Sequence, residues 1–135
     1  MKEHYVNYEQ AVKLKKLGFD WDVNKVYHRP STLAEWELFP WHSEYNDWNN
    51  EGKFYRSAPT LSLAQKWLRD KWQIHVEPNF IYETKFEVII KRQKGSIFKR
   101  AERQFNSYEE ALSFGIDEAL NLLTDKSTTN DNKTI

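Results

Sequence analysis

The sequence predicts an α+β fold, and three observations support that prediction. Three segments combine a helix-capping pattern with apolar residues at helical spacing, which is typical of amphipathic helices. Other segments alternate apolar and polar residues, which is the pattern of half-buried strands. Turn residues separate neighbouring strands at hairpin distances. We therefore expect a single domain, with an antiparallel β-sheet and about three helices packed mainly on one face.

The first predicted helix covers residues 8–17. Asn7 and Gln10 fit a capping box, in which each side chain bonds the backbone N–H of the other residue. Gly18 is expected to end the helix in a left-handed turn, and Phe19 is expected to fold back on the last helical turn.

The next segment predicts strands interrupted by one long loop. Ala34, Trp36 and Leu38 alternate with glutamates, whereas residues 40–52 are polar and rich in turn residues. We expect an aromatic, acidic hairpin and loop insert near residues 33–56. The predicted strands are 26–28, 33–39 and 53–56.

The second half of the chain predicts the order helix, strand, strand, strand, helix. Pro78 is expected to limit the first of these strands, and a turn at 93–96 separates the last two. Ser107 and Glu110 form a capping box, and Gly115 lies on the apolar stripe of the last helix, which indicates close packing on the sheet. The predicted helices are 61–72 and 108–123, and the predicted strands are 74–77, 80–91 and 97–105.

The domain is expected to cover residues 1–124. Residues 125–135 contain no apolar stripe that a helix could bury, so they predict a disordered tail.

Composition excludes several classes of protein. The 135 residues contain no cysteine, which rules out disulfides, thiol catalysis and cysteine-based metal sites. Lys and Arg balance Asp and Glu at 20 each, so no net charge favours a particular partner. No apolar run is long enough to span a membrane, and the start of the chain has no signal-peptide pattern. We expect a cytoplasmic protein.

No catalytic, cofactor-binding or metal-binding residue is predicted. The four histidines have none of the spacings of a local zinc motif, and the four glycines are too far apart for a nucleotide-binding loop. An enzyme that brings distant carboxylates together remains an open alternative.

A basic hairpin is the first candidate binding site. Residues 91–103 carry six positive charges and one negative charge, with an aromatic ring among them. Phosphates attract such a patch, whereas the acidic start of the following helix, at Glu109 and Glu110, opposes a polyanion. Charges on a hairpin also keep an edge strand soluble. The candidate nucleic-acid-binding residues are Lys91, Arg92, Lys94, Phe98, Lys99, Arg100 and Arg103.

The aromatic insert is the second candidate site. Exposed Trp and Tyr side chains mark protein contacts, although rings in this segment could instead complete the core. The candidate protein-binding residues are Trp36, Trp41, Tyr45 and Trp48.

Several segments together resemble a family of small uncharacterised proteins from gut Bacteroidetes and their prophage-like or mobile elements. The resemblance covers roughly residues 5–123, and it implies a bacterial or phage cytosolic protein without implying an activity. The segments that carry it are 8–19, 58–71, 74–76 and 107–111.

From these observations we expect a non-enzymatic accessory or adaptor protein that binds another protein. The alternative is a nucleic-acid-binding accessory factor that uses residues 91–103, and an enzyme comes third. No cofactor is expected, and the oligomeric state is left open.

Overall fold

The computed structural model describes residues 3–29, 34–40, 55–92 and 97–133, with the backbone alone at 39–40, 97–103 and 125–133. The chain divides into two compact units, Met1–Thr60 and Leu61–Ile135. The described residues form three helices and two antiparallel sheets, which confirms the α+β class. The strands form two small sheets where one was predicted, because each unit has a core of its own.

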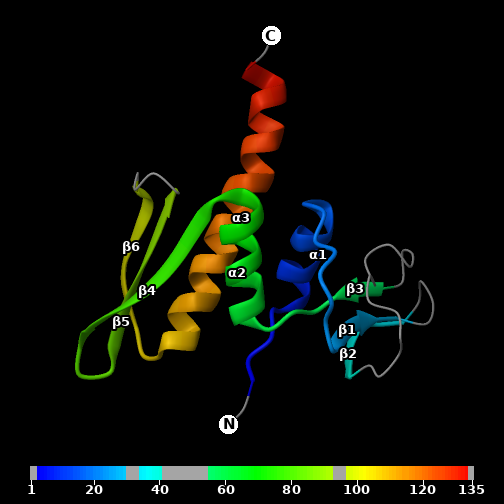
Figure 1. Ribbon diagram of the computed structural model, residues 1–135, viewed down its shortest axis with the longest axis horizontal. Helices are drawn as coiled ribbons and strands as arrows, with labels where there is room; N and C mark the ends of the chain where they lie inside the picture. Colours follow the sequence, from blue (N-terminus) through cyan, green and yellow to red (C-terminus); the bar gives the residue numbers. More distant parts are fainter. Residues whose placement is uncertain (1–2, 30–33, 41–54, 93–96, 134–135) are drawn as a thin grey trace. The chain divides into compact units, whose positions relative to one another are not determined.

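The first unit combines one helix with a three-stranded sheet of order β2-β1-β3 (Figure 1). Val26 of β1 is buried, and it lies opposite the buried Ser57 of β3. Helix α1 packs against β3 and buries Ala11 and Leu14. The elements of this unit are α1 (Tyr8–Lys16), β1 (Lys25–His28), β2 (Glu37–Pro40) and β3 (Tyr55–Ser57).

Both ends of α1 form as the sequence predicted. Asn7 Oδ1 accepts a hydrogen bond of 2.8 Å from the backbone N–H of Gln10. In return, the backbone N–H of Asn7 donates to Gln10 Oε1 at 2.9 Å. Gly18 has a φ of 90°, and the N–H of Phe19 donates to the carbonyl of Leu14 at 2.9 Å. This left-handed turn places the Phe19 ring in the core, where it is buried.

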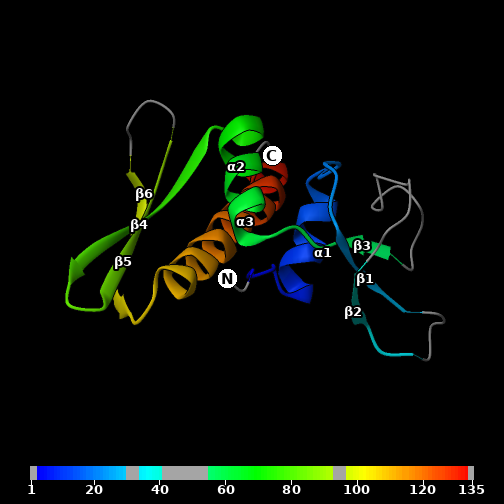
Figure 2. The same cartoon turned by 60° about the horizontal axis from the view of Figure 1, so that its bottom comes forward.

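The second unit packs two helices on a three-stranded sheet of order β4-β5-β6 (Figures 1 and 2). Helix α3 contacts all three strands, and α2 contacts both β4 and α3. The helix-strand-strand-strand-helix order is as predicted. The elements are α2 (Leu61–Trp72), β4 (Ile74–Tyr82), β5 (Lys85–Arg92), β6 (Ile97–Phe105) and α3 (Tyr108–Lys133).

Strand β4 continues through Pro78, where the sequence predicted that the strand would end. Proline is tolerated here because β4 lies at the edge of its sheet, so the missing N–H would point away from β5. The carbonyl of Val76 points toward the same edge and accepts a hydrogen bond of 2.7 Å from Gln65 Nε2. The predicted strand 80–91 is divided instead by a turn between β4 and β5, where Glu83 has a φ of 51°.

Helix α3 extends to Lys133, beyond the predicted end at residue 123. Figure 1 shows its last turns continuing past the sheet. No Gly or Pro follows Gly115. Once a helix is formed, each added residue gains a backbone hydrogen bond, so a polar sequence without breakers can continue it. The segment predicted as a disordered tail is therefore helical as far as Lys133.

Gly115 allows α3 to lie close to its sheet, as its place on the apolar stripe indicated. A Cβ atom added to Gly115 would stand 2.5 Å from Cγ1 of Val76 and 2.6 Å from Cγ2 of Val88. Both distances are far inside van der Waals contact. Any larger residue would force α3 away from β4 and β5.

Replacing Gly115 with Ala should therefore destabilise the protein, although Gly to Ala in a helix normally gains about 1 kcal/mol. Overpacking of this kind costs about 1–3 kcal/mol. Urea unfolding of the full chain measures the change. The double variant Gly115→Ala, Val88→Ala is the control, because shortening Val88 removes one of the two close contacts of the new methyl group. It should be more stable than the sum of the two single effects; an additive result would contradict the close contact.

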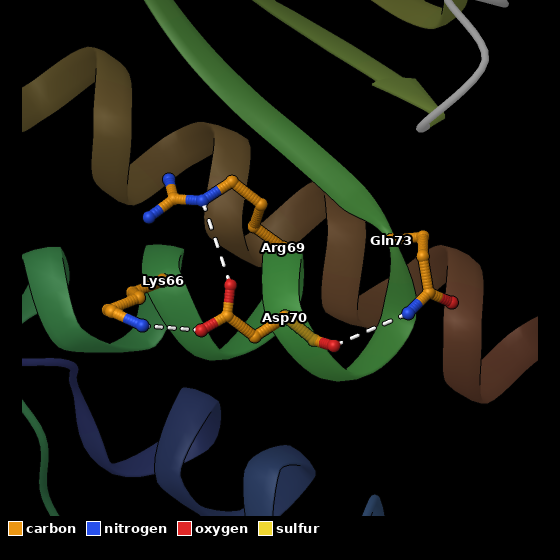
Figure 3. A network of polar contacts seen from close by, with 4 residues as sticks. All are labelled: Lys66, Arg69, Asp70 and Gln73. Atoms are coloured by element: carbon orange, nitrogen blue, oxygen red, sulfur yellow. Dashed lines mark hydrogen bonds and ion pairs between the residues drawn. The ribbon is translucent and has the colours of Figure 1, made fainter.

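The C-terminus of α2 holds a small polar network (Figure 3). Asp70 forms an ion pair with Lys66, and its Oδ1 lies 3.9 Å from Nε of Arg69. The hydrogen bond from Lys66 lowers the pKa of Asp70. Gln73 ends the helix with a φ of 55° and donates from Nε2 to the carbonyl of Asp70 at 3.3 Å. Because these groups are exposed, the ion pairs contribute little, and the backbone of Gln73 matters more.

Gln73→Gly should raise the free energy of unfolding by about 0.5–1 kcal/mol. Glycine adopts the left-handed conformation without the penalty that a Cβ imposes, and its extra entropy in the unfolded chain offsets only part of that gain. Thermal and urea unfolding measure the effect. Gln73→Ala is the matched control: it removes the same side-chain hydrogen bond but keeps the Cβ, so it should give no gain. Equal stability of the two variants would contradict this account.

Candidate functional site

Only one of the four predicted aromatic binding residues lies in the part of the chain that the structure describes. Trp36 is half-buried, and its ring centroid lies 5.0 Å from that of Tyr8 on α1. Trp41, Tyr45 and Trp48 fall outside the described residues. Trp36 is therefore part of a packed group of side chains in the first unit and does not project freely into solvent.

Two arginines cover the ring of Trp36. Cζ of Arg29, at the end of β1, lies 4.9 Å from the Trp36 ring centroid, and Cζ of Arg56, on β3, lies 4.8 Å from it. Guanidinium groups at this distance are attracted by the negative face of the indole. The strand order β2-β1-β3 brings the three residues together, since Trp36 precedes β2 directly.

A third cation joins this group through Tyr55. Lys15 Nζ and Arg56 Nη1 both donate to the carbonyl of Tyr55, at 3.4 Å and 2.8 Å. The pKa of Lys15 is lowered, mainly by burial and to a smaller extent by the nearby charge of Arg56. The ring of His28 stacks on Tyr55, with centroids 4.7 Å apart. We call this set the Trp36 cluster: Lys15, His28, Arg29, Trp36, Tyr55 and Arg56.

The structure describes the side chains of only part of the predicted basic hairpin. Lys91 Nζ pairs with Glu77 Oε2 at 3.1 Å, so its charge is already engaged. The backbone register sets Lys99 opposite Ile90 and Arg100 opposite Ile89. Lys94 lies outside the described residues, and Arg92 is exposed. Phe98 and Arg103 belong to β6, where the backbone alone is described.

A surface that the sequence analysis did not single out lies at the tip of the β4–β5 hairpin. Phe80 is 63% exposed, Tyr82 49% and Ile81 39%, and Tyr108 at the start of α3 is 41% exposed. The rings of Phe80 and Tyr108 both lie edge-on to Phe86, at centroid distances of 5.8 Å and 6.2 Å. We call Phe80, Phe86 and Tyr108 the hairpin-tip patch.

The polar rim of this patch holds the hairpin in place. Lys85 Nζ donates to Asn106 Oδ1 at 2.5 Å, and the hydroxyl of Tyr82 donates to Gln104 Oε1 at 3.4 Å. A sequence signal for the patch does exist. Phe80, Ile81 and Tyr82 are three consecutive apolar residues in a strand, and successive side chains point to opposite faces, so one helix-covered face cannot bury all three.

Comparisons with protein-family models, with curated proteins and with solved structures found no match to this chain. Within the described ranges, no three or more His, Asp or Glu side chains gather closely enough to hold a metal ion. No helix in the described part of the chain is both long and apolar enough to cross a membrane. The candidate sites are therefore the Trp36 cluster and the hairpin-tip patch.

Proposed function

We propose that this is a non-enzymatic accessory or adaptor protein that binds another protein through the hairpin-tip patch. The observation that supports the proposal is the 63% exposure of Phe80, whose ring lies edge-on to Phe86, as does the ring of the exposed Tyr108. Exposed aromatic side chains gathered at one place mark protein contacts, whereas single exposed apolar residues are ordinary. From the resemblance noted above, we further propose that the protein acts in the cytoplasm of a bacterium or of a phage-infected cell.

The patch has the composition of a small interface core. Aromatic residues contribute large contact areas at a low cost in side-chain entropy, and they dominate binding energy when a partner covers them. Phe86 forms the base of the patch, and its edge-on contacts with Phe80 and Tyr108 hold both rings in defined positions. Lys85, Gln104 and Asn106 supply the polar rim that interfaces commonly have. The partner is expected to present an apolar pocket to Phe80.

A photo-crosslinking amino acid at position 80 should capture this partner in cells. We expect one discrete adduct of the full-length protein, because a specific interface holds the reactive group against one surface. The same amino acid at Lys66, exposed on α2, is the control and should give no adduct. The additional change Tyr108→Ala should weaken the adduct from position 80, because Tyr108 contacts the same Phe86 ring. An adduct pattern that is the same from both positions, or none from position 80, would overturn the proposal.

Nucleic-acid binding by residues 91–103 is the alternative, and it has a test of its own. Lys91 is engaged by Glu77, and Glu109 and Glu110 in the first turn of α3 oppose a polyanion, so we expect no binding of single- or double-stranded DNA or RNA at low salt. If binding occurs, the variant Lys94→Glu, Lys99→Glu, Arg100→Glu should flatten the log–log salt slope by roughly 2–3. Salt-dependent binding that this variant loses would replace the protein-binding proposal.

A further inference from the structure

The hairpin-tip patch lies against the start of α3. Lys85 Nζ donates to Asn106, which precedes α3, and the ring of Phe86 contacts that of Tyr108, the first residue of α3. Both views show the β4–β5 turn and the start of α3 at the same end of the second unit (Figures 1 and 2). Charged residues in these two segments therefore border the exposed rings.

Glu109 lies on the flank of α3 that faces β4. The opposite flank is marked by Phe114, whose ring packs against Phe105 of β6 with centroids 5.0 Å apart. Glu109 lies about 140° around the helix from Phe114, and about two turns before the buried Ile116 on its own flank. Because the strand order is β4-β5-β6, the flank away from β6 faces β4, where Phe80 is exposed.

Two carboxylates beside the rings have no partner in the part of the chain that the structure describes. Glu109 is half-buried and Glu83, in the β4–β5 turn, is exposed, and neither side chain forms an ion pair or a hydrogen bond there. Lys85 is bonded to Asn106, and as the strand neighbour of Phe86 it belongs to the other face of the sheet. The described surface around the rings is therefore apolar and negatively charged.

The turn holds Glu83 in a conformation that glycine or asparagine adopts more easily. Its φ is 51°, in the left-handed region, where a glutamate pays a steric penalty. No contact of its side chain within the described residues compensates for that penalty. Residues held in unfavourable conformations gather at binding sites, where the side chain has a use outside the fold.

We propose that the protein partner of the hairpin-tip patch contributes a basic segment, in which an apolar side chain covers the rings and a neighbouring Lys or Arg pairs with Glu109 and Glu83. This inference rests on the proposed function and adds the chemistry of the partner. Negative charge at the rim of an interface attracts a positive surface and rejects an acidic one. A second copy of this chain is disfavoured as the occupant, because a symmetric contact would bring the same carboxylates together.

The yield of the adduct from the photo-crosslinking amino acid at position 80 of the full chain tests the role of Glu109. Glu109→Lys should lower this yield by about tenfold or more, because attraction becomes repulsion. Glu110→Lys is the matched control and should keep the wild-type yield. It changes the same charge in the same helical turn, but it lies about 200° around α3 from Tyr108.

Each failure of this experiment has a distinct meaning. Equal yields from Glu109→Lys, Glu110→Lys and the wild type, or an equal loss in both variants, would overturn the basic partner and leave the proposed function intact. No adduct from position 80 in any protein would overturn the proposed function itself. If Glu109→Lys fails to fold, as circular dichroism shows, Glu109→Gln decides the test with an expected loss of about threefold.

A matched pair of variants tests Glu83. Asp and Asn both tolerate the left-handed conformation and differ in charge, so Glu83→Asp and Glu83→Asn should both fold at least as stably as the wild type. Glu83→Asn should lower the adduct yield by about threefold, whereas Glu83→Asp should keep it. Equal yields from the two variants would overturn the pairing of Glu83 with the partner.

Mass spectrometry of the adduct then identifies the crosslinked segment of the partner. We expect a Lys or Arg beside the crosslinked apolar residue. Replacing that cation with Glu in the partner should weaken the adduct of the wild type and restore the adduct of Glu109→Lys, since the charges are exchanged. A crosslinked segment without a basic residue, or an exchange that restores nothing, would overturn the proposal.

Discussion

The second unit depends on how closely α3 approaches its sheet. At Gly115 the helix backbone comes so near that the methyl groups of Val76 and Val88 occupy the space of a side chain. Those two valines lie on adjacent strands, so this single contact fixes the helix across the β4–β5 pair. The buried residues of α3, which include Ala111, Leu112, Ile116, Ala119 and Leu120, then align over the same face. With one face covered, the strand register is set, because a shift of one residue would expose the valines.

The two candidate sites differ in the physical property that they offer. The hairpin-tip patch offers apolar rings near the first turn of α3. It lies at the end of β4, where the strand residues are exposed and no longer buried by the helices. The Trp36 cluster offers positive charge held on an aromatic ring, with a buried N–H of Arg29 that no described residue satisfies. A ligand for one would suit the other poorly.

Apart from the close approach at Gly115, the features that the sequence predicted correctly are local ones. The Asn7–Gln10 capping box, the left-handed Gly18 and helix α2 each depend on residues within a few positions. The features that it missed depend on tertiary neighbours. Whether Pro78 ends a strand depends on whether that strand lies at an edge, which the local sequence does not determine. Likewise, Arg29 and Arg56 contact Trp36 only because β1 pairs with both β2 and β3. The sequence analysis selected Trp36 from its residue type alone and did not predict these contacts.

The edge formed by β4 also bears on how this protein avoids aggregation. An open strand edge is a template on which another chain can add its own strand, and repeated addition leads to fibres. Pro78 lacks the donor that such templating needs, and the side chain of Gln65 already occupies the carbonyl of Val76. Strand addition at this edge is therefore blocked over its central residues. At the opposite edge, the sequence of β6 carries Lys99, Arg100 and Arg103, so the pairing of two identical copies there would bring like charges together.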